Sequence, residues 1–135
     1  MTLSTQDALV YLMVVSASSD TEMTDFEFER IDGLVERAPV FAGYDRSGLA
    51  KTVNDCVDLA NSGTGLEGVL DLAIAALPKR LQDTAYALCV EVTAADLQLE
   101  QEELRLLEMI RDRLDIDRLV TAAIETSARA RYRKA

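Results

Sequence analysis

Residues 20–27 read Asp20-Thr21-Glu22-Met23-Thr24-Asp25-Phe26-Glu27 and stand between two apolar helix patterns. A similar stretch, Asp96-Leu97-Gln98-Leu99-Glu100-Gln101-Glu102-Glu103, follows at an offset of 76 residues. Both copies fit Asp-x-x-(Met/Leu)-x-x-x-Glu, and apolar residues align in their flanks, as Leu12 does with Leu88. We therefore predict a fold built on two pseudo-repeated helix–acidic loop–helix units.

Apolar residues recur at helical spacing along the chain, and no segment has the alternation that is typical of a strand. Caps, prolines and glycines divide the pattern into helices. The predicted fold class is all-α, a compact bundle of about seven helices. The expected helices cover about residues 5–18, 24–37, 47–60, 64–77, 78–95, 100–114, and a last one from a cap at Asp115 or Asp117 to about 128.

Local signals sharpen these boundaries. Residues 9–15 are apolar nearly all round, which predicts that the first helix is central. Thr24 and Glu27 have the spacing of a capping box, and Thr64 with Glu67 repeats it. Pro78 is expected to open the fifth helix as its first residue. The last helix is expected to bury an apolar face of Leu119, Val120, Ala123 and Ile124.

The composition favours one acidic globular domain over residues 1–135. The chain holds 49% hydrophobic residues, enough for a core, and 24 acidic against 14 basic residues, a net charge of −10. This balance excludes general nucleic-acid binding, which needs a basic surface. Basic residues gather in the segment 130–135, which we expect to fray. No segment is long and apolar enough to span a bilayer, so we expect a cytoplasmic protein.

The sequence lacks the usual catalytic signals. There is no histidine, and the two cysteines, Cys56 and Cys89, sit in apolar helix patterns as expected for reduced, buried thiols. A zinc site of the usual kind cannot be built from these residues. No nucleophile elbow or glycine-rich phosphate loop is visible. We therefore expect a protein that is not an enzyme.

The two acidic stretches are candidates for a metal site. If the two units are related by pseudo-symmetry, Asp20, Glu27, Asp96 and Glu103 come close together, and crowded carboxylates are favourable mainly around a hard cation. Such oxygen ligands suit Ca²⁺, Mg²⁺ or Mn²⁺. Neither stretch is an EF-hand loop, because glycine and glutamate are missing at the positions that loop requires. The alternative is that these acidic residues only cap helices and complement their dipoles.

The apolar run Ala8–Ala17, followed by the stretch 20–27, resembles the entry of the tellurite-resistance TerB-like proteins, and the stretch from Ala87 to Asp115 resembles their second motif. The glycine that usually follows the aspartate in that family is Thr21 here and Leu97 in the repeat. The resemblance implies a seven-helix bundle, an acidic, metal-binding surface and a role in bacterial stress response. It also implies other stress-response proteins as partners in a membrane-associated assembly.

Two functions remain open from the sequence. The first is a divalent-cation-binding interaction module with the four carboxylates as ligands. The second is a metal-free interaction domain that uses an acidic face and the basic C-terminal tail.

Overall fold

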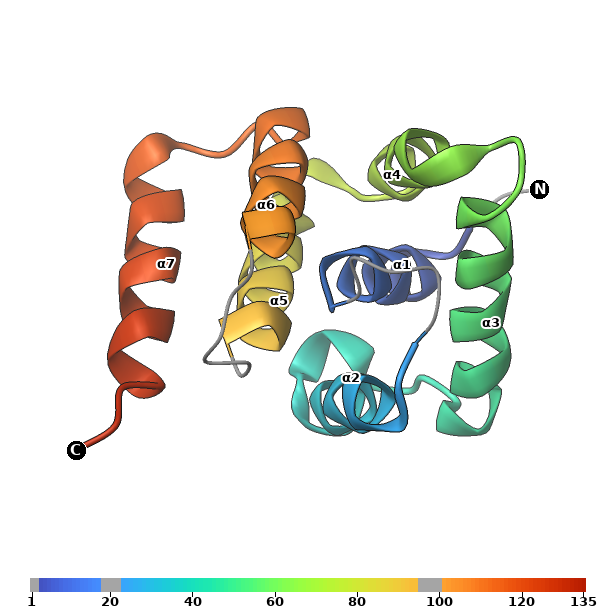
Figure 1. Ribbon diagram of the computed structural model, residues 1–135, viewed down its shortest axis with the longest axis horizontal. Coiled ribbons are helices and arrows are strands. Elements are labelled where there is room, and N and C mark those ends of the chain that lie inside the picture. Colours follow the sequence, from blue (N-terminus) through green and yellow to red (C-terminus); the bar gives the residue numbers. More distant parts are fainter. Residues whose placement is uncertain (1–2, 18–22, 95–100) are drawn as a thin grey trace.

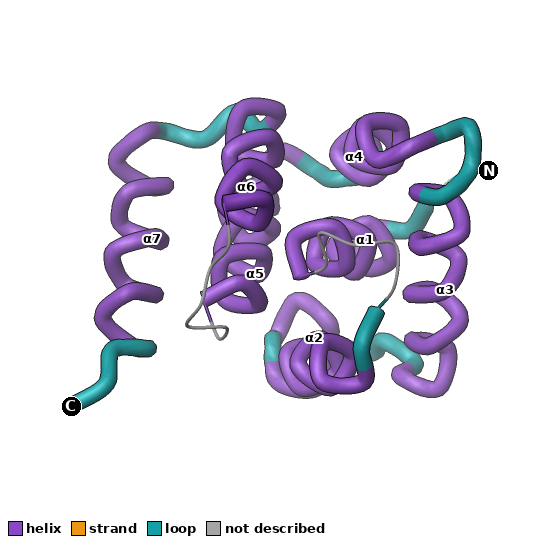
Figure 2. The backbone as a smooth tube through the Cα atoms, in the orientation of Figure 1, coloured by secondary structure: helices purple, strands orange, loops and turns teal. Residues whose placement is uncertain are grey.

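The computed structural model describes residues 3–17, 23–94 and 101–135, and only the backbone of residues 101–103. Those ranges form seven α-helices and contain no strand (Figures 1 and 2). The predicted all-α class is confirmed. The helices are α1 (Thr5–Ala17), α2 (Asp25–Arg37), α3 (Leu49–Ala60), α4 (Gly65–Ala75), α5 (Gln82–Ala94), α6 (Gln101–Arg113) and α7 (Arg118–Arg131).

Helix α1 lies at the centre of the bundle, as predicted. All its residues from Ala8 to Ala17 are buried. It packs against α2, α3, α4, α5 and α6, which surround it in Figure 1. An element surrounded in this way cannot carry a polar face, and this explains the nearly continuous apolar run. Helix α7 lies outside this arrangement and packs against α5.

Side-chain caps fix the starts of three helices. Ser4 Oγ accepts a hydrogen bond from the amide of Asp7 at 3.0 Å at the start of α1. Thr24 and Glu27 form the predicted capping box, with the Glu27 amide donating to Thr24 Oγ1 at 3.1 Å and the Thr24 amide donating to Glu27 Oε1 at 2.9 Å. Asp117, one of the two predicted caps of the last helix, accepts from the amide of Leu119 at 2.7 Å.

One predicted side-chain cap and one predicted helix start are wrong. Thr64 makes no side-chain cap, because the chain enters α4 through Gly65 at a φ of 67° and the Thr64 methyl group lies against Gly68 instead. Pro78 does not open the fifth helix. Its extended backbone precedes a 3₁₀ turn, η3 (Lys79–Leu81), and α5 starts only at Gln82. Similar 3₁₀ turns, η1 (Pro39–Phe41) and η2 (Arg46–Gly48), connect α2 to α3.

The orientation of α7 also differs from the prediction. Of the predicted apolar face, Leu119 is 81% exposed, Val120 is 39% exposed and Ala123 is exposed, while Ile124 is half-buried and packs against the core. Thr121 and Ala128 are buried instead. Polar anchors hold the helix in this orientation. Tyr132, at its end, donates to Glu91 Oε1 of α5 at 2.7 Å, and Arg131 pairs with the same carboxylate. The segment 130–135 therefore begins as anchored helix.

The pseudo-symmetry of the two helix–loop–helix units stays a prediction. The described parts of both units hold their aligned apolar residues at or near the core, including Leu12 with Leu88 and Val14 with Val90. The acidic loops themselves, residues 18–22 and 95–100, lie outside the described residues.

Candidate functional site

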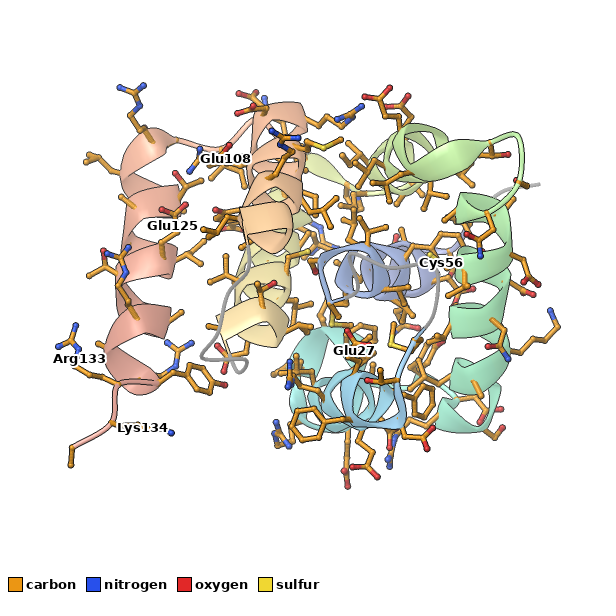
Figure 3. All side chains as sticks on the ribbon, viewed as in Figure 1. Glu27, Cys56, Glu108, Glu125, Arg133 and Lys134 are labelled. Atoms are coloured by element: carbon orange, nitrogen blue, oxygen red, sulfur yellow. The ribbon has the colours of Figure 1, made fainter. Side chains whose placement is uncertain are left out.

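Of the four predicted metal ligands, only Glu27 has a described side chain. Glu27 lies in the first turn of α2, where its carboxylate accepts from the Thr24 amide (Figure 3). Asp20 and Asp96 lie outside the described residues, and so does the side chain of Glu103. Among the side chains that the structure does describe, no group of three or more cysteines or carboxylates could hold a metal ion. The predicted four-carboxylate site therefore stays a prediction.

The helices that lead into the two acidic stretches end side by side. The hydroxyl of Thr93, in the last turn of α5, lies 3.4 Å from the carbonyl oxygen of Ser16, in the last turn of α1. Both residues are fully buried. The C-terminal end of a helix carries a partial negative charge, so two such ends in contact create a local preference for positive charge.

We call this contact between Ser16 and Thr93, at the ends of α1 and α5, the joint. A basic side chain already lies next to it. Arg30 of α2 donates from Nη1 to the carbonyl oxygen of Val92 at 3.0 Å, and its guanidinium carbon lies 4.7 Å from the centre of the Phe26 ring. Phe26 is 68% exposed. Arg30 is the one basic residue in the first 35 positions of the chain. The end of α5 is thus a place where the fold accommodates a cation.

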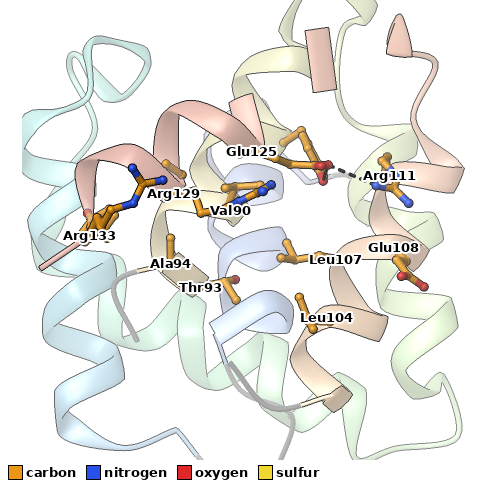
Figure 4. A pocket seen from close by; sticks show the side chains of 13 residues that line it. Val90, Thr93, Ala94, Leu104, Leu107, Glu108, Arg111, Glu125, Arg129 and Arg133 are labelled. Atoms are coloured by element: carbon orange, nitrogen blue, oxygen red, sulfur yellow. Dashed lines mark hydrogen bonds and ion pairs between the residues drawn. The ribbon is translucent and has the colours of Figure 1, made fainter. Parts of the chain in front are cut away.

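A groove of about 510 Å³ lies between α6 and α7, with α5 as its floor (Figure 4). Most of the side chains that line it are apolar or aromatic. They are Tyr86, Val90 and Ala94 of α5, Leu104 and Leu107 of α6, and Ala128 and Tyr132 at α7, with Thr93 of α5 beside them. Leu104 is 44% exposed, so the apolar lining reaches solvent.

One end of the groove is closed by a polar cluster. The Tyr86 hydroxyl donates to Glu125 Oε2 at 2.5 Å, and Arg111 Nη1 donates to the same oxygen at 3.2 Å (dashed line in Figure 4). Burial, followed by the bond to Glu125, raises the pKa of Tyr86 above its usual range. The phenol therefore stays protonated at neutral pH and acts as a hydrogen-bond donor to Glu125.

The two walls of the groove also carry charged side chains that form no ion pair with a described residue. Arg129 and Arg133 line the wall at α7, and Glu108 lines the wall at α6. None of the three forms an ion pair with a described residue, in contrast to Arg111 and Arg131 nearby. No motif in the sequence pointed to this groove, because it depends on the packing of α6 and α7 on α5, and Arg133 belongs to the segment 130–135 that was expected to fray.

The two cysteines contribute no reactive site. Cys56 and Cys89 are free and fully buried. Burial raises the pKa of each thiol to about 12, so neither forms a thiolate at neutral pH.

Comparison of the chain with protein-family models, with curated proteins and with solved structures finds no match. In the part of the chain that the structure describes, every helix is too short or too polar to cross a membrane.

Proposed function

We propose that this domain is a non-enzymatic interaction module that binds a divalent cation at the joint between the ends of α1 and α5. The observation that carries the proposal is the contact between Thr93 and Ser16, because it shows that the two helix ends lie side by side. Chain connectivity then limits how far the acidic residues can lie from the joint. Asp20 follows Ala17 by three residues, a reach of at most about 11 Å, and Asp96 follows Ala94 by two, at most about 7 Å.

The chemistry of such a site favours a hard ion. The proposed ligands are the carboxylates Asp20, Glu27, Asp96 and Glu103, and oxygen ligands of this kind select Ca²⁺, Mg²⁺ or Mn²⁺. The negative ends of the two helices add to the attraction. The net charge of −10 raises the local concentration of cations further.

The biological setting of the proposal follows from the resemblance to TerB-like proteins. By that likeness we propose a cytoplasmic role in bacterial stress response, including tellurite resistance, within a membrane-associated assembly of other stress-response proteins. The resemblance rests on the two acidic motifs and the apolar run before the first.

The second candidate function is a metal-free interaction domain. Two observations favour it: Glu27 is already bonded in its capping box, and Arg30 already places a positive charge at the end of α5. In this case the acidic stretches only start helices, and the partner binds elsewhere on the domain.

Thermal unfolding after exhaustive chelation separates the two candidates. We would add Ca²⁺, Mg²⁺ or Mn²⁺ to the wild type and to Asp20→Asn/Asp96→Asn. An ion bound only by the folded state stabilises it by about 2.7 kcal/mol when the free ion is at about a hundred times its Kd, and this raises Tm by several degrees. A matched control, Asp58→Asn/Asp112→Asn, makes the same change in charge at exposed positions of α3 and α6.

The cation proposal requires that at least one ion raises Tm. That increase should also be seen in the control and should be absent in the Asp20→Asn/Asp96→Asn variant. No shift for any ion would leave the metal-free interaction domain as the function. A shift that both variants lose equally would mean diffuse attraction to an acidic surface rather than a site.

A further inference from the structure

We propose that the groove between α6 and α7 binds an amphipathic helix of a partner protein, one that carries acidic residues along the flank facing α7. The proposal rests on the part of the proposed function that makes this domain an interaction module, and it does not depend on the cation. It rests on the shape of the groove, its lining and its unpaired charges, all of them in described residues.

The length of the groove suits about two turns of helix. Its floor runs along α5 from Tyr86 to Ala94, a rise of about 12 Å. Helix α6 packs on α1 and α5, while α7 packs on α5, so the two walls stand apart on a shared floor (Figure 1). Among the described residues, Arg111 and Glu125 form the one ion pair that bridges the walls, and it lies at the closed end. A guest helix over α5 would complete a four-helix arrangement.

The open side of the groove favours a helix over a small ligand. A site for a small molecule usually encloses most of the ligand's surface. Here Leu104 remains 44% exposed, and no described element covers the groove. A guest helix needs only one apolar face covered, and its outer face can stay in water. Leu104, with the half-buried Ala94 and Tyr132, supplies the accessible surface for that apolar face.

The charges on the two walls define the flanks of the guest. Arg129 and Arg133 stand on the wall at α7, and Glu108 stands on the wall at α6 (Figure 4). Acidic side chains on one flank of the guest would pair with the two arginines, and a basic side chain on the other flank would face Glu108. Such complementarity sets the orientation and the association rate more than the affinity, which the apolar contacts supply.

Selection from a displayed library of single helices tests the proposal. The library fixes leucine at positions i, i+3, i+4 and i+7 and randomises both flanks over Glu, Lys and Ala. The baits are the wild type and Arg129→Glu/Arg133→Glu, both in excess chelator, so that the result is independent of any cation. We expect acidic residues to be enriched on one flank with the wild type and basic residues on that same flank with the variant.

A second step measures the Kd of the best acidic-flank peptide. Arg129→Glu/Arg133→Glu should weaken binding at least about tenfold, and Leu104→Lys should weaken it as well. The control Arg105→Glu/Arg118→Glu changes the net charge equally at exposed positions outside the groove and should leave Kd within about twofold. Circular dichroism and Tm confirm that all variants fold, as expected for exposed positions.

Several results would overturn the proposal. One is that the library yields no enriched helix while dodecanoate binds in the groove. The occupant would then be a small amphiphile. Another is that both baits enrich the same charge on the same flank, or that the selected helices bind Leu104→Lys as tightly as the wild type. A third is a dimer of the free protein that Leu104→Lys dissociates, because the groove would then belong to a second copy of this chain.

Discussion

The hydroxyl of Thr93 lies 3.4 Å from the carbonyl oxygen of Ser16, and this contact joins the last turn of α5 to the last turn of α1. The same hydroxyl donates to the Cys89 carbonyl at 2.7 Å, and the Ser16 hydroxyl donates to the Leu12 carbonyl at 2.9 Å. Both hydroxyls are thus satisfied within their own helices. The two helices can therefore pack closely through buried polar side chains without leaving a donor unpaired.

Replacing Thr93 by valine tests how much its buried hydroxyl stabilises the fold. Thr93→Val keeps the shape of the side chain but removes its donor, so we expect the free energy of unfolding to fall by about 0.5–1.5 kcal/mol. Urea unfolding measures the change. Thr126→Val, at an exposed position of α7, is the control and should change it by less than about 0.5 kcal/mol. An equal effect of both variants would contradict a specific role for Thr93.

Stability should fall in alkaline solution. Burial raises the pKa of the Cys56 and Cys89 thiols to about 12, and burial followed by the charges of Cys56, Asp55 and Asp7 raises that of Tyr11 to about 12. In the unfolded chain, thiols ionise near pH 8.5 and tyrosine near 10. The unfolded state therefore loses protons that the folded state keeps, and the free energy of unfolding declines as pH rises from about 8.5 toward 12.

Urea midpoints between pH 7 and pH 11 check this pH dependence. They should be flat to about pH 8 and then decrease. In Cys56→Ala/Cys89→Ala the decrease should begin near pH 10 instead, because only tyrosine ionisation remains. A decrease that begins at the same pH in both proteins would show that the thiols are not its cause.

The orientation of α7 gives a direct test at two positions. Leu119 is 81% exposed, so Leu119→Lys should change the free energy of unfolding by less than about 0.5 kcal/mol. Ala128 is 2% exposed against α5, so Ala128→Lys should cost more than about 2 kcal/mol, because it forces a charge into the interface. Thermal and urea unfolding measure both. If Leu119→Lys proves the more destabilising, the helix is turned as the apolar pattern alone predicts.

The wrong prediction of the buried face of α7 shows that hydrophobic periodicity alone does not determine how a helix is oriented. A count of apolar residues selects Leu119, Val120, Ala123 and Ile124, yet of these only Ile124 packs against the core, beside Thr121 and Ala128. Glu125 and Tyr132 bind Tyr86 and Glu91 of α5. These partners lie about 40 residues away in the chain, so the sequence gives no local sign of them. Tertiary hydrogen bonds decided the orientation.

The central part of the fold was easier to predict because its signals are local. The run from Ala8 to Ala17 is apolar on every side, and only a fully surrounded helix can bury it. The capping box of Thr24 and Glu27 lies within four consecutive residues. The groove, by contrast, depends on the separation of α6 and α7, which follows from how each packs on α5. No spacing within either helix encodes that separation.

The position of Arg30 leads to a last prediction, on cation binding. Its guanidinium bonds to the Val92 carbonyl at the end of α5, next to the joint where we propose the cation site. A fixed positive charge repels a divalent ion, so removing it should strengthen binding. Two unit charges about 8 Å apart in water interact by about 0.5 kcal/mol, which doubles for a divalent ion and corresponds to about fivefold in Kd.

We therefore expect Arg30→Gln to tighten the binding of the preferred ion about fivefold, as measured by isothermal titration calorimetry. Arg118→Gln removes the same charge from the exposed start of α7, and its effect should be within about twofold, because salt screens a distant surface charge. The two variants have equal net charge, so the comparison isolates position from overall charge. Equal gains in both variants would argue for diffuse attraction. Weaker binding in Arg30→Gln alone would mean that Arg30 organises the end of α5 rather than competing with an ion there.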